Sequence, residues 1–320
     1  MPTLYGNILT SSGWCHGRLG FDAQIHIIDG AAADPAGNGD DLILPGFIDL
    51  HVHGGGGRDV MEGADALATI TRTHARHGTT SLLATTMTAP KREIEHALRG
   101  VHDAVAQRAT GGARVLGVHL EGPYINPGKL GAQPNFARDG MLTEISGFNT
   151  LAPIKVLTLA PEVQGHMDLI GELVSHGIRV QLGHTLGSYE DAVEALKHGA
   201  KSFTHLFNAM SGLHHREPGM VGAALAHAEY AELIPDLLHV HPGAIKAALR
   251  AIPKLYCVTD STAAAGMPDG NYKLGRHTVT KCLGGVRLPD GTLAGSTLTL
   301  DEALRNLVGL GLDIDDASRR

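Results

Sequence analysis

PGFIDLHVHGGGG, residues 45–57, joins an apolar strand to two histidines and a run of four glycines. Side chains in a strand alternate between faces, so Asp49, His51 and His53 share one face and the apolar residues between them share the other. Two imidazoles at a strand end, followed by a loop with almost no side chains, can hold a metal ion above a sheet. Two solvent-facing histidines would give the same pattern, so the rest of the chain has to decide.

From Pro45 onward, short apolar runs alternate with amphipathic stretches, which is typical of βα units and a parallel sheet. Strand candidates occupy residues 47–53, 79–86, 114–121, 154–162, 178–184, 201–208, 237–241 and 254–260. Eight parallel strands with intervening helices predict an α/β fold of the (β/α)8 TIM-barrel type, and an open doubly wound sheet is the alternative.

Most of these strand candidates end in a polar residue, and a barrel brings such ends together at one mouth. The residues are His53, Glu121, Glu162, His184, His205, His239 and Asp260. An open sheet would spread them along a line, so their number favours the barrel.

Residues 1–44 hold short β-prone pieces broken by glycine and predict a small β-domain, with the barrel domain at 45–320. A hairpin-like stretch near 276–294 is a candidate to join the small domain.

The net charge of −7 includes no long run of either sign, which argues against nucleic acid as the main partner. The widely spaced cysteines, Cys15, Cys257 and Cys282, indicate a reducing compartment. The N-terminus lacks the pattern of a signal peptide, and no stretch is long and apolar enough for a membrane span. We therefore expect a cytoplasmic protein.

Glu121 ends an apolar strand candidate, where a carboxylate is costly to bury unless it meets a cation. A helix-capping role fits the same position. Together with His51, His53, His184 and His205, it makes a set of nitrogen and oxygen ligands suited to Zn²⁺ or a similar divalent ion. Two ions are possible, with Glu121 between them.

Asp260 ends the last strand candidate, where it fits either a general base or a helix N-cap. The loop after His205 offers Asn208, the backbone at Ala209 and Arg216. The fork of Arg216 suits bidentate binding of a phosphate, and a surface pair with Glu217 is the plainer reading.

Several long motifs resemble the N-acetylglucosamine-6-phosphate deacetylases of the amidohydrolase superfamily. These are PGFIDLHVHG, HLEGPYINPGKLGAQ, LGHT, THLFNAMSGLHHREPG, HVHP and VTDSTAAAG, in order from about Pro45. The resemblance implies a metal-dependent TIM barrel with a small β-sandwich, acting in amino-sugar catabolism and cell-wall sugar recycling.

By position, the resemblance implies Glu121, His184 and His205 as principal metal ligands and His51 and His53 as ligands of a second ion. The ion is expected to be Zn²⁺, with Fe²⁺, Mn²⁺ or Co²⁺ possible, and one or two per subunit. In the matching positions, Asp260 is the catalytic acid and base, and His239 contacts the sugar and polarises the amide carbonyl. Sugar- and phosphate-binding positions correspond to Ala132, Gln133, Asn208, Ala209 and Arg216.

In the family the Arg216 counterpart crosses a dimer interface, so a homodimer is expected, and Gln133 stands where some relatives have histidine. This chain ends at DIDDASRR, earlier than family members usually do, so we expect a partly truncated β-sandwich. The alternatives are another amidohydrolase, such as an N-acetylgalactosamine-6-phosphate deacetylase or a cyclic-amide hydrolase, and an inactive truncated relative that binds metal or sugar phosphate.

Overall fold

The computed structural model describes residues 1–37 and 39–320, which divide into two compact units. The smaller unit comprises Met1–Gly46 with Asp313–Arg319, and the larger comprises Phe47–Leu312 with Arg320. The boundary lies close to the domain boundary predicted at residue 44, but residues 313–319 belong to the smaller unit.

The smaller unit is built on one four-stranded sheet in the order β3-β2-β1-β4. Its elements are β1 (Thr3–Thr10), β2 (Gly13–Phe21), β3 (Ile25–Ala32), β4 (Leu42–Ile43) and the helix α9 (Ile314–Arg319). The first three strands are antiparallel, and β4 runs parallel to β1. Ile8, Leu9 and Leu19 are buried, whereas β3 is almost entirely exposed.

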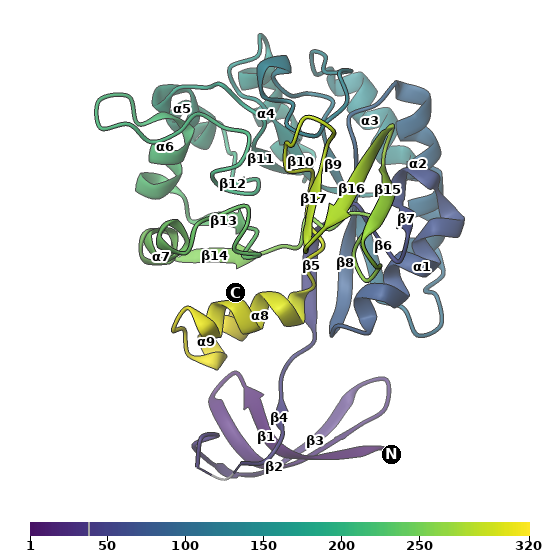
Figure 1. Cartoon of the computed structure of the whole chain (residues 1–320), viewed down its shortest axis with the longest axis vertical. Coiled ribbons are helices and arrows are strands. Elements are labelled where there is room, and N and C mark those ends of the chain that lie inside the picture. The colour runs from purple at the N-terminus through teal and green to yellow at the C-terminus, as the bar shows by residue number, and fades with distance from the viewer. Residues whose placement is uncertain (38) are drawn as a thin grey trace. The chain divides into compact units, whose positions relative to one another are not determined.

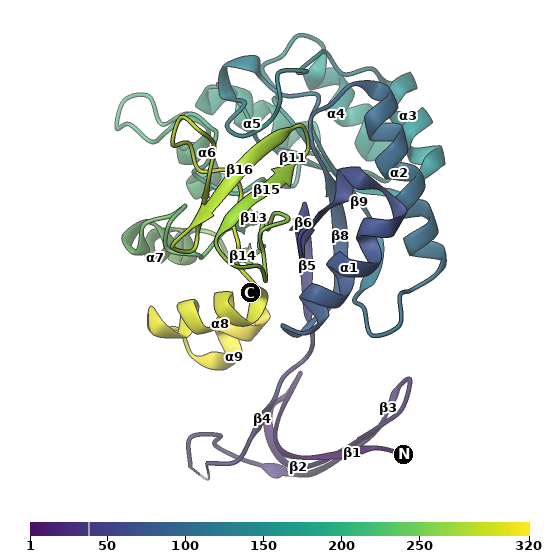
Figure 2. The ribbon, with the colours of Figure 1, turned by 45° about the vertical axis from the view of Figure 1, so that its right-hand side comes forward.

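Residues 47–312 contain eight parallel strands that close into a barrel (Figures 1 and 2). They are β5 (Phe47–Val52), β8 (Thr79–Thr86), β9 (Arg114–Glu121), β10 (Ile154–Leu159), β11 (Arg179–Leu182), β12 (Ser202–Phe203), β13 (Tyr230–Leu233) and β14 (Lys254–Cys257). The first six form one sheet in chain order, and β13 pairs with β14. The bond from Leu206 N–H to Glu232 O (2.9 Å) joins the chain after β12 to β13, and a parallel bridge between Val52 and Ser261 closes the ring. The predicted (β/α)8 fold is confirmed.

Helices lie around the outside of the barrel strands (Figures 1 and 2). They are α1 (Ala64–Ala75), α2 (Lys91–Ala106), α3 (Leu142–Leu151), α4 (His166–Ser175), α5 (Tyr189–Lys197), α6 (Gly219–His227), α7 (Pro242–Ala251) and, at the end, α8 (Leu300–Gly309). In α2 the buried residues Ile94, Ala97, Leu98 and Val101 recur with the period of a helix, so one apolar stripe faces the strands. Ile94, Leu98 and Val101 each contribute about 1.5–3 kcal/mol when fully buried.

The seventh strand is not where the sequence predicted it. Residues 237–241 form bends that lead into α7, and the strand is β13, Tyr230–Leu233. The side chain of Asp236 accepts hydrogen bonds from the N–H groups of Leu238 (2.9 Å) and His239 (2.8 Å). These N–H groups are bonded within a local turn and are not available to pair with a neighbouring strand. The apolar and polar residues of 237–241 nevertheless alternate as they do in a strand.

The stretch 276–294 belongs to the larger unit and not to the small β-domain. It contributes to an antiparallel sheet of β15 (Gly270–Leu274), β16 (His277–Cys282) and β17 (Gly285–Arg287). Buried Leu274, Val279 and Val286 pack in one cluster with Met87 and Ala264 of the barrel unit, and this apolar contact accounts for their placement.

Short elements complete the larger unit: β6 (Gly54–Gly55), β7 (Arg58–Asp59) and the 3₁₀ helices η1 (Val60–Glu62) and η2 (Pro127–Lys129). Across residues 1–37 and 39–320, no helix combines the length and the apolar character needed to cross a membrane.

Candidate active site

The opening strand of the barrel, β5, turns its polar face into the molecule. Asp49, His51 and His53 are all buried, whereas Ile48, which precedes them on the other face of the strand, is 56% exposed. The alternation predicted from the sequence is therefore present, and it delivers two imidazoles into the barrel.

Three side chains from different strand ends form a first cluster. The Glu121 Oε1 atom lies 3.2 Å from His184 Nε2 and 3.0 Å from His205 Nε2, and the two nitrogens are 3.1 Å apart. All three residues are buried. These residues are 21 to 84 positions apart in the sequence, and the barrel brings them together.

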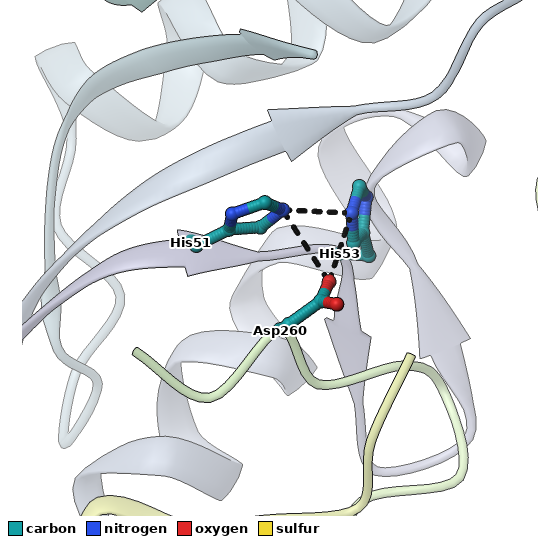
Figure 3. A group of neighbouring side chains, drawn as sticks. All are labelled: His51, His53 and Asp260. Carbon is teal, nitrogen blue, oxygen red and sulfur yellow. Dashed lines mark hydrogen bonds and ion pairs between the residues drawn. The ribbon is translucent and has the colours of Figure 1, made fainter. Parts of the chain in front are cut away.

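His51, His53 and Asp260 form a second cluster (Figure 3). His51 Nε2 and His53 Nε2 are 3.1 Å apart, and each is 3.3 Å from Asp260 Oδ1. Glu121 reaches this cluster too, with Oε2 at 3.1 Å from His53 Nε2 and Oε1 at 3.5 Å from His51 Nε2. Glu121 therefore stands between the two sets.

Hydrogen bonds orient two of the imidazoles. The Nδ1–H of His184 donates to the carbonyl of Lys129 (2.8 Å), and that of His51 donates to Glu232 Oε2 (3.0 Å). Since a carbonyl and a carboxylate only accept, each ring carries a proton on Nδ1 and turns its Nε2 toward the clusters. Buried imidazole nitrogens and carboxylate oxygens a little over 3 Å apart fit a divalent cation placed among them.

The electrostatics of the clusters agree with a site built for positive charge. Burial opposes a charge on Glu121, but His51, His184 and His205 hold the pKa of this carboxyl well below its usual range. Burial is likewise outweighed at Asp260, where His51 and His53 lower the pKa to about 2. Both carboxylates are therefore ionised at neutral pH.

Three of these residues have left-handed backbones: His184 (φ 49°), His205 (φ 30°) and Asp260 (φ 48°). Such conformations cost about 1–3 kcal/mol each and tend to occur at functional sites. Each follows shortly after a barrel strand, so the chain turns sharply there.

A cavity of about 340 Å³ lies over the clusters. The predicted site residues that line it are His53, Glu121, Ala132, Gln133, His184, His205, Asn208, Ala209, His239 and Asp260. This volume is in the range of small-molecule sites. His51 is buried beneath it, in contact with both clusters.

Gln133 lines the cavity but has both ends of its amide in use. Its Nε2 donates to Glu121 Oε2 (2.6 Å), and its Oε1 accepts from the backbone N–H of Thr88 (2.7 Å). Its hydrogen bonds therefore go to the protein.

Arg216, unlike the other predicted substrate-binding residues, does not line the cavity. It is exposed, and its Nη1 lies 2.7 Å from His215 Nε2. Glu162, at a predicted strand end, accepts hydrogen bonds from Asn126, Thr185 and Leu186 and ties loops together.

Two carboxylates in the site were missed from the sequence. Asp236 Oδ2 lies 2.6 Å from His239 Nδ1; burial lowers the pKa of His239, but Asp236 outweighs it and raises the pKa overall. The other is Glu232 on β13. Asp236 stands three residues before His239 in PDLLH, a turn pattern that was open to recognition, whereas Glu232 sits in an apolar run with no distinguishing signal.

The amidohydrolase family model matches residues 42–305. The chain is 43% identical over 297 residues to N-acetylglucosamine-6-phosphate deacetylase of Vibrio furnissii, covering 90% of this chain and 72% of that protein. It is 41% identical over 316 residues to N-acetylgalactosamine-6-phosphate deacetylase of Escherichia coli O157:H7, covering 95% and 82%.

Solved structures of N-acetylglucosamine-6-phosphate deacetylases superpose on almost the whole of this chain. The N-acetylglucosamine-6-phosphate deacetylase of Thermotoga maritima superposes with a TM-score of 0.89 at 32% identity, over 99% of this chain and 87% of that chain. A variant of the Mycobacterium smegmatis enzyme in complex with N-acetyl-D-glucosamine 6-phosphate has a TM-score of 0.88 at 32% identity, over 99% and 86%.

Proposed function

Because this chain belongs to the amidohydrolase family, in its group of N-acetylglucosamine-6-phosphate deacetylases, we propose that it hydrolyses N-acetyl-D-glucosamine 6-phosphate. The products are D-glucosamine 6-phosphate and acetate. The observation that carries the proposal is the convergence of Glu121, His184, His205 and Asp260 on one cavity in such a chain.

The metal centre comprises Glu121, His184 and His205 for one ion and His51, His53 and Asp260 for a second, with Glu121 adjoining both. Zinc is the ion we propose, since imidazole and carboxylate ligands suit it. A divalent ion held there supplies Lewis acidity toward water and toward the amide carbonyl.

Asp260 is the proposed acid and base. As a buried carboxylate that lines the cavity, it can accept a proton as a water oxygen bonds to the acetyl carbon. It then returns this proton to the amide nitrogen as the C–N bond breaks, which releases the amine and acetate. The buried setting, in which Asp260 is 8% exposed, limits exchange of that proton with bulk water.

His239 is proposed to stabilise the oxyanion. Asp236 raises the pKa of His239 and accepts from its Nδ1, so a protonated ring has its Nε2–H free to donate. A donor placed at a developing oxyanion is worth about 3–4 kcal/mol in the transition state.

Sugar contacts are assigned to Ala132, Asn208 and Ala209, which line the cavity beside the clusters. Gln133 corresponds to a sugar-binding position in the family, but its two hydrogen bonds, to Glu121 and to the backbone of Thr88, support a role in holding Glu121. We propose that Arg216 binds the phosphate of the substrate held by a second subunit, since it is exposed and lies outside its own cavity. A homodimer is part of this proposal. A cytoplasmic location is also proposed, and the free thiols of Cys15, Cys257 and Cys282 support it.

N-acetylgalactosamine 6-phosphate is a second candidate substrate. The 41% identity to a deacetylase of that sugar phosphate, over 82% of its length, favours testing it alongside the first.

The test is acetate release by the zinc-loaded protein from both sugar phosphates and from N-acetylglucosamine without phosphate, with Asp260→Asn as control. Turnover that requires the phosphate and Asp260, and that is faster with the gluco epimer, supports the proposal. A folded, metal-loaded protein that releases no acetate from N-acetylglucosamine 6-phosphate refutes it.

A further inference from the structure

Glu232 is a buried carboxylate to which the proposed reaction gives no role. It lies on β13, is 0% exposed and does not line the cavity. Burying a charged carboxylate is costly unless hydrogen bonds and charges compensate for it, so its partners indicate what it does.

One oxygen of Glu232 reaches both halves of the metal centre. Oε2 accepts from His51 Nδ1–H at 3.0 Å and from the backbone N–H of His205 at 3.1 Å. The other oxygen, Oε1, is 3.5 Å from the hydroxyl of Tyr256 and 4.0 Å from His119 Nδ1. The short contacts therefore all involve Oε2.

The bond to His51 decides what that ring can do. With its proton on Nδ1, the ring keeps a lone pair on Nε2, the atom that faces His53 and Asp260. Figure 3 shows that the other ring nitrogen of His51 points away from these two residues. Without an acceptor at Glu232, the proton could reside on either nitrogen, and the ring could also turn.

The bond to His205 acts on the backbone. His205 has φ 30°, a conformation that needs support from its surroundings, and its ring Nδ1 has no hydrogen-bond partner among the described residues. The hydrogen bond from its N–H to Glu232 therefore helps to hold the His205 backbone in this conformation.

We propose that Glu232 is a positioning residue of the metal centre, which fixes the Nδ1–H tautomer of His51 and anchors the backbone of His205. The inference rests on the metal centre of the proposed function. Loss of a hydrogen-bond partner of a metal ligand typically weakens metal binding about 10- to 100-fold, and we expect a change of this size for the ion that His51 binds.

The test measures zinc affinity by competition with a chromophoric chelator, for wild type and for the variants Glu232→Ala, Glu232→Gln and Tyr256→Phe. Glu232→Ala should weaken the ion bound by His51 about 10- to 100-fold. Glu232→Gln should recover much of this loss, because its amide oxygen can accept from the same two donors. Tyr256→Phe removes a contact to the other oxygen in the same part of the barrel, and it should bind zinc as wild type does.

A second comparison separates positioning from a general effect on the fold. In a His51→Ala background, adding Glu232→Ala should change zinc affinity much less than it does in wild type, since the ring on which Glu232 acts is gone. In the zinc-loaded wild type, nitrogen NMR shifts of His51 should report the Nδ1–H tautomer.

Unchanged zinc affinity in Glu232→Ala would overturn the inference, as would equal losses in Glu232→Ala and Tyr256→Phe or equal losses in the two backgrounds. These outcomes leave the proposed deacetylase intact. A wild-type protein that binds no metal would refute the metal centre itself, and acetate release from the wild type tests that separately.

Discussion

Gln133→Ala distinguishes a residue that holds the metal centre from one that binds sugar. In the wild type, the Gln133 side chain joins Glu121 to the backbone of Thr88 with bonds of 2.6 and 2.7 Å. Alanine removes both bonds, and the side chain is only 6% exposed, so water does not readily replace them.

The cost follows from the two partners. A hydrogen bond to a charged group contributes about 1.5–3 kcal/mol, and a buried backbone N–H left without an acceptor costs about 1–3 kcal/mol. We expect the free energy of unfolding to fall by roughly 2.5–6 kcal/mol in total. At about 2 °C per kcal/mol for a chain of this size, Tm should fall by roughly 5–12 °C.

The assay is thermal and urea unfolding of the metal-free protein, followed by circular dichroism, so that metal binding does not contribute. Lys129→Ala is the matched control, because Lys129 lines the same cavity and the substitution retains its carbonyl, which accepts from His184. For this control we expect the free energy of unfolding to stay within about 0.5 kcal/mol of the wild-type value.

The reasoning would be refuted if the free energy of unfolding of Gln133→Ala lay within about 1 kcal/mol of the wild-type value. A simultaneous rise in KM with unchanged kcat would then assign Gln133 to direct sugar binding, as its position in the sequence had suggested.

Further predictions concern the phosphate, the metal and pH. Arg216→Ala should raise KM for the phosphorylated substrate about 10- to 100-fold with little change in kcat, and an equal loss with unphosphorylated substrate in steady-state kinetics would contradict phosphate binding. Removal of metal with a chelator should abolish acetate release and lower Tm, with recovery on adding Zn²⁺; activity that persists in protein shown by elemental analysis to be metal-free would exclude the metal centre. Burial lowers the pKa of His166, whose ring accepts from Gly140 N–H (2.8 Å) and donates to Ala160 O (2.8 Å). As the pH falls, His166 of the unfolded chain is therefore protonated first, near pH 6.5, and His166 of the folded chain only at a lower pH. Stability from this residue is therefore present above pH 6.5 and lost below it, and the difference in unfolding free energy between wild type and His166→Asn should narrow from pH 7.5 to 5.5; a difference independent of pH would contradict this.

The barrel was largely predictable, because its strands are apolar runs of suitable length with amphipathic segments between them. The exception is β13, where the short strand Tyr230–Leu233 contains a glutamate and the next apolar run imitates a strand. Since Asp236 captures the amides of that run locally, its structure depends on a turn that hydrophobic alternation does not reveal. The error in placing this strand also concealed Glu232.

The sequence by itself determined the local features: the period of two that places His51 and His53 on one face, and polar residue types at the strand ends. The tertiary structure decided which of these ends meet. Glu121 contacts His205 across 84 positions only because the sheet closes, and closure depends on the packing of the whole unit. Left-handed backbones and the buried partners of imidazoles are likewise held by distant contacts, so no short stretch of sequence specifies them.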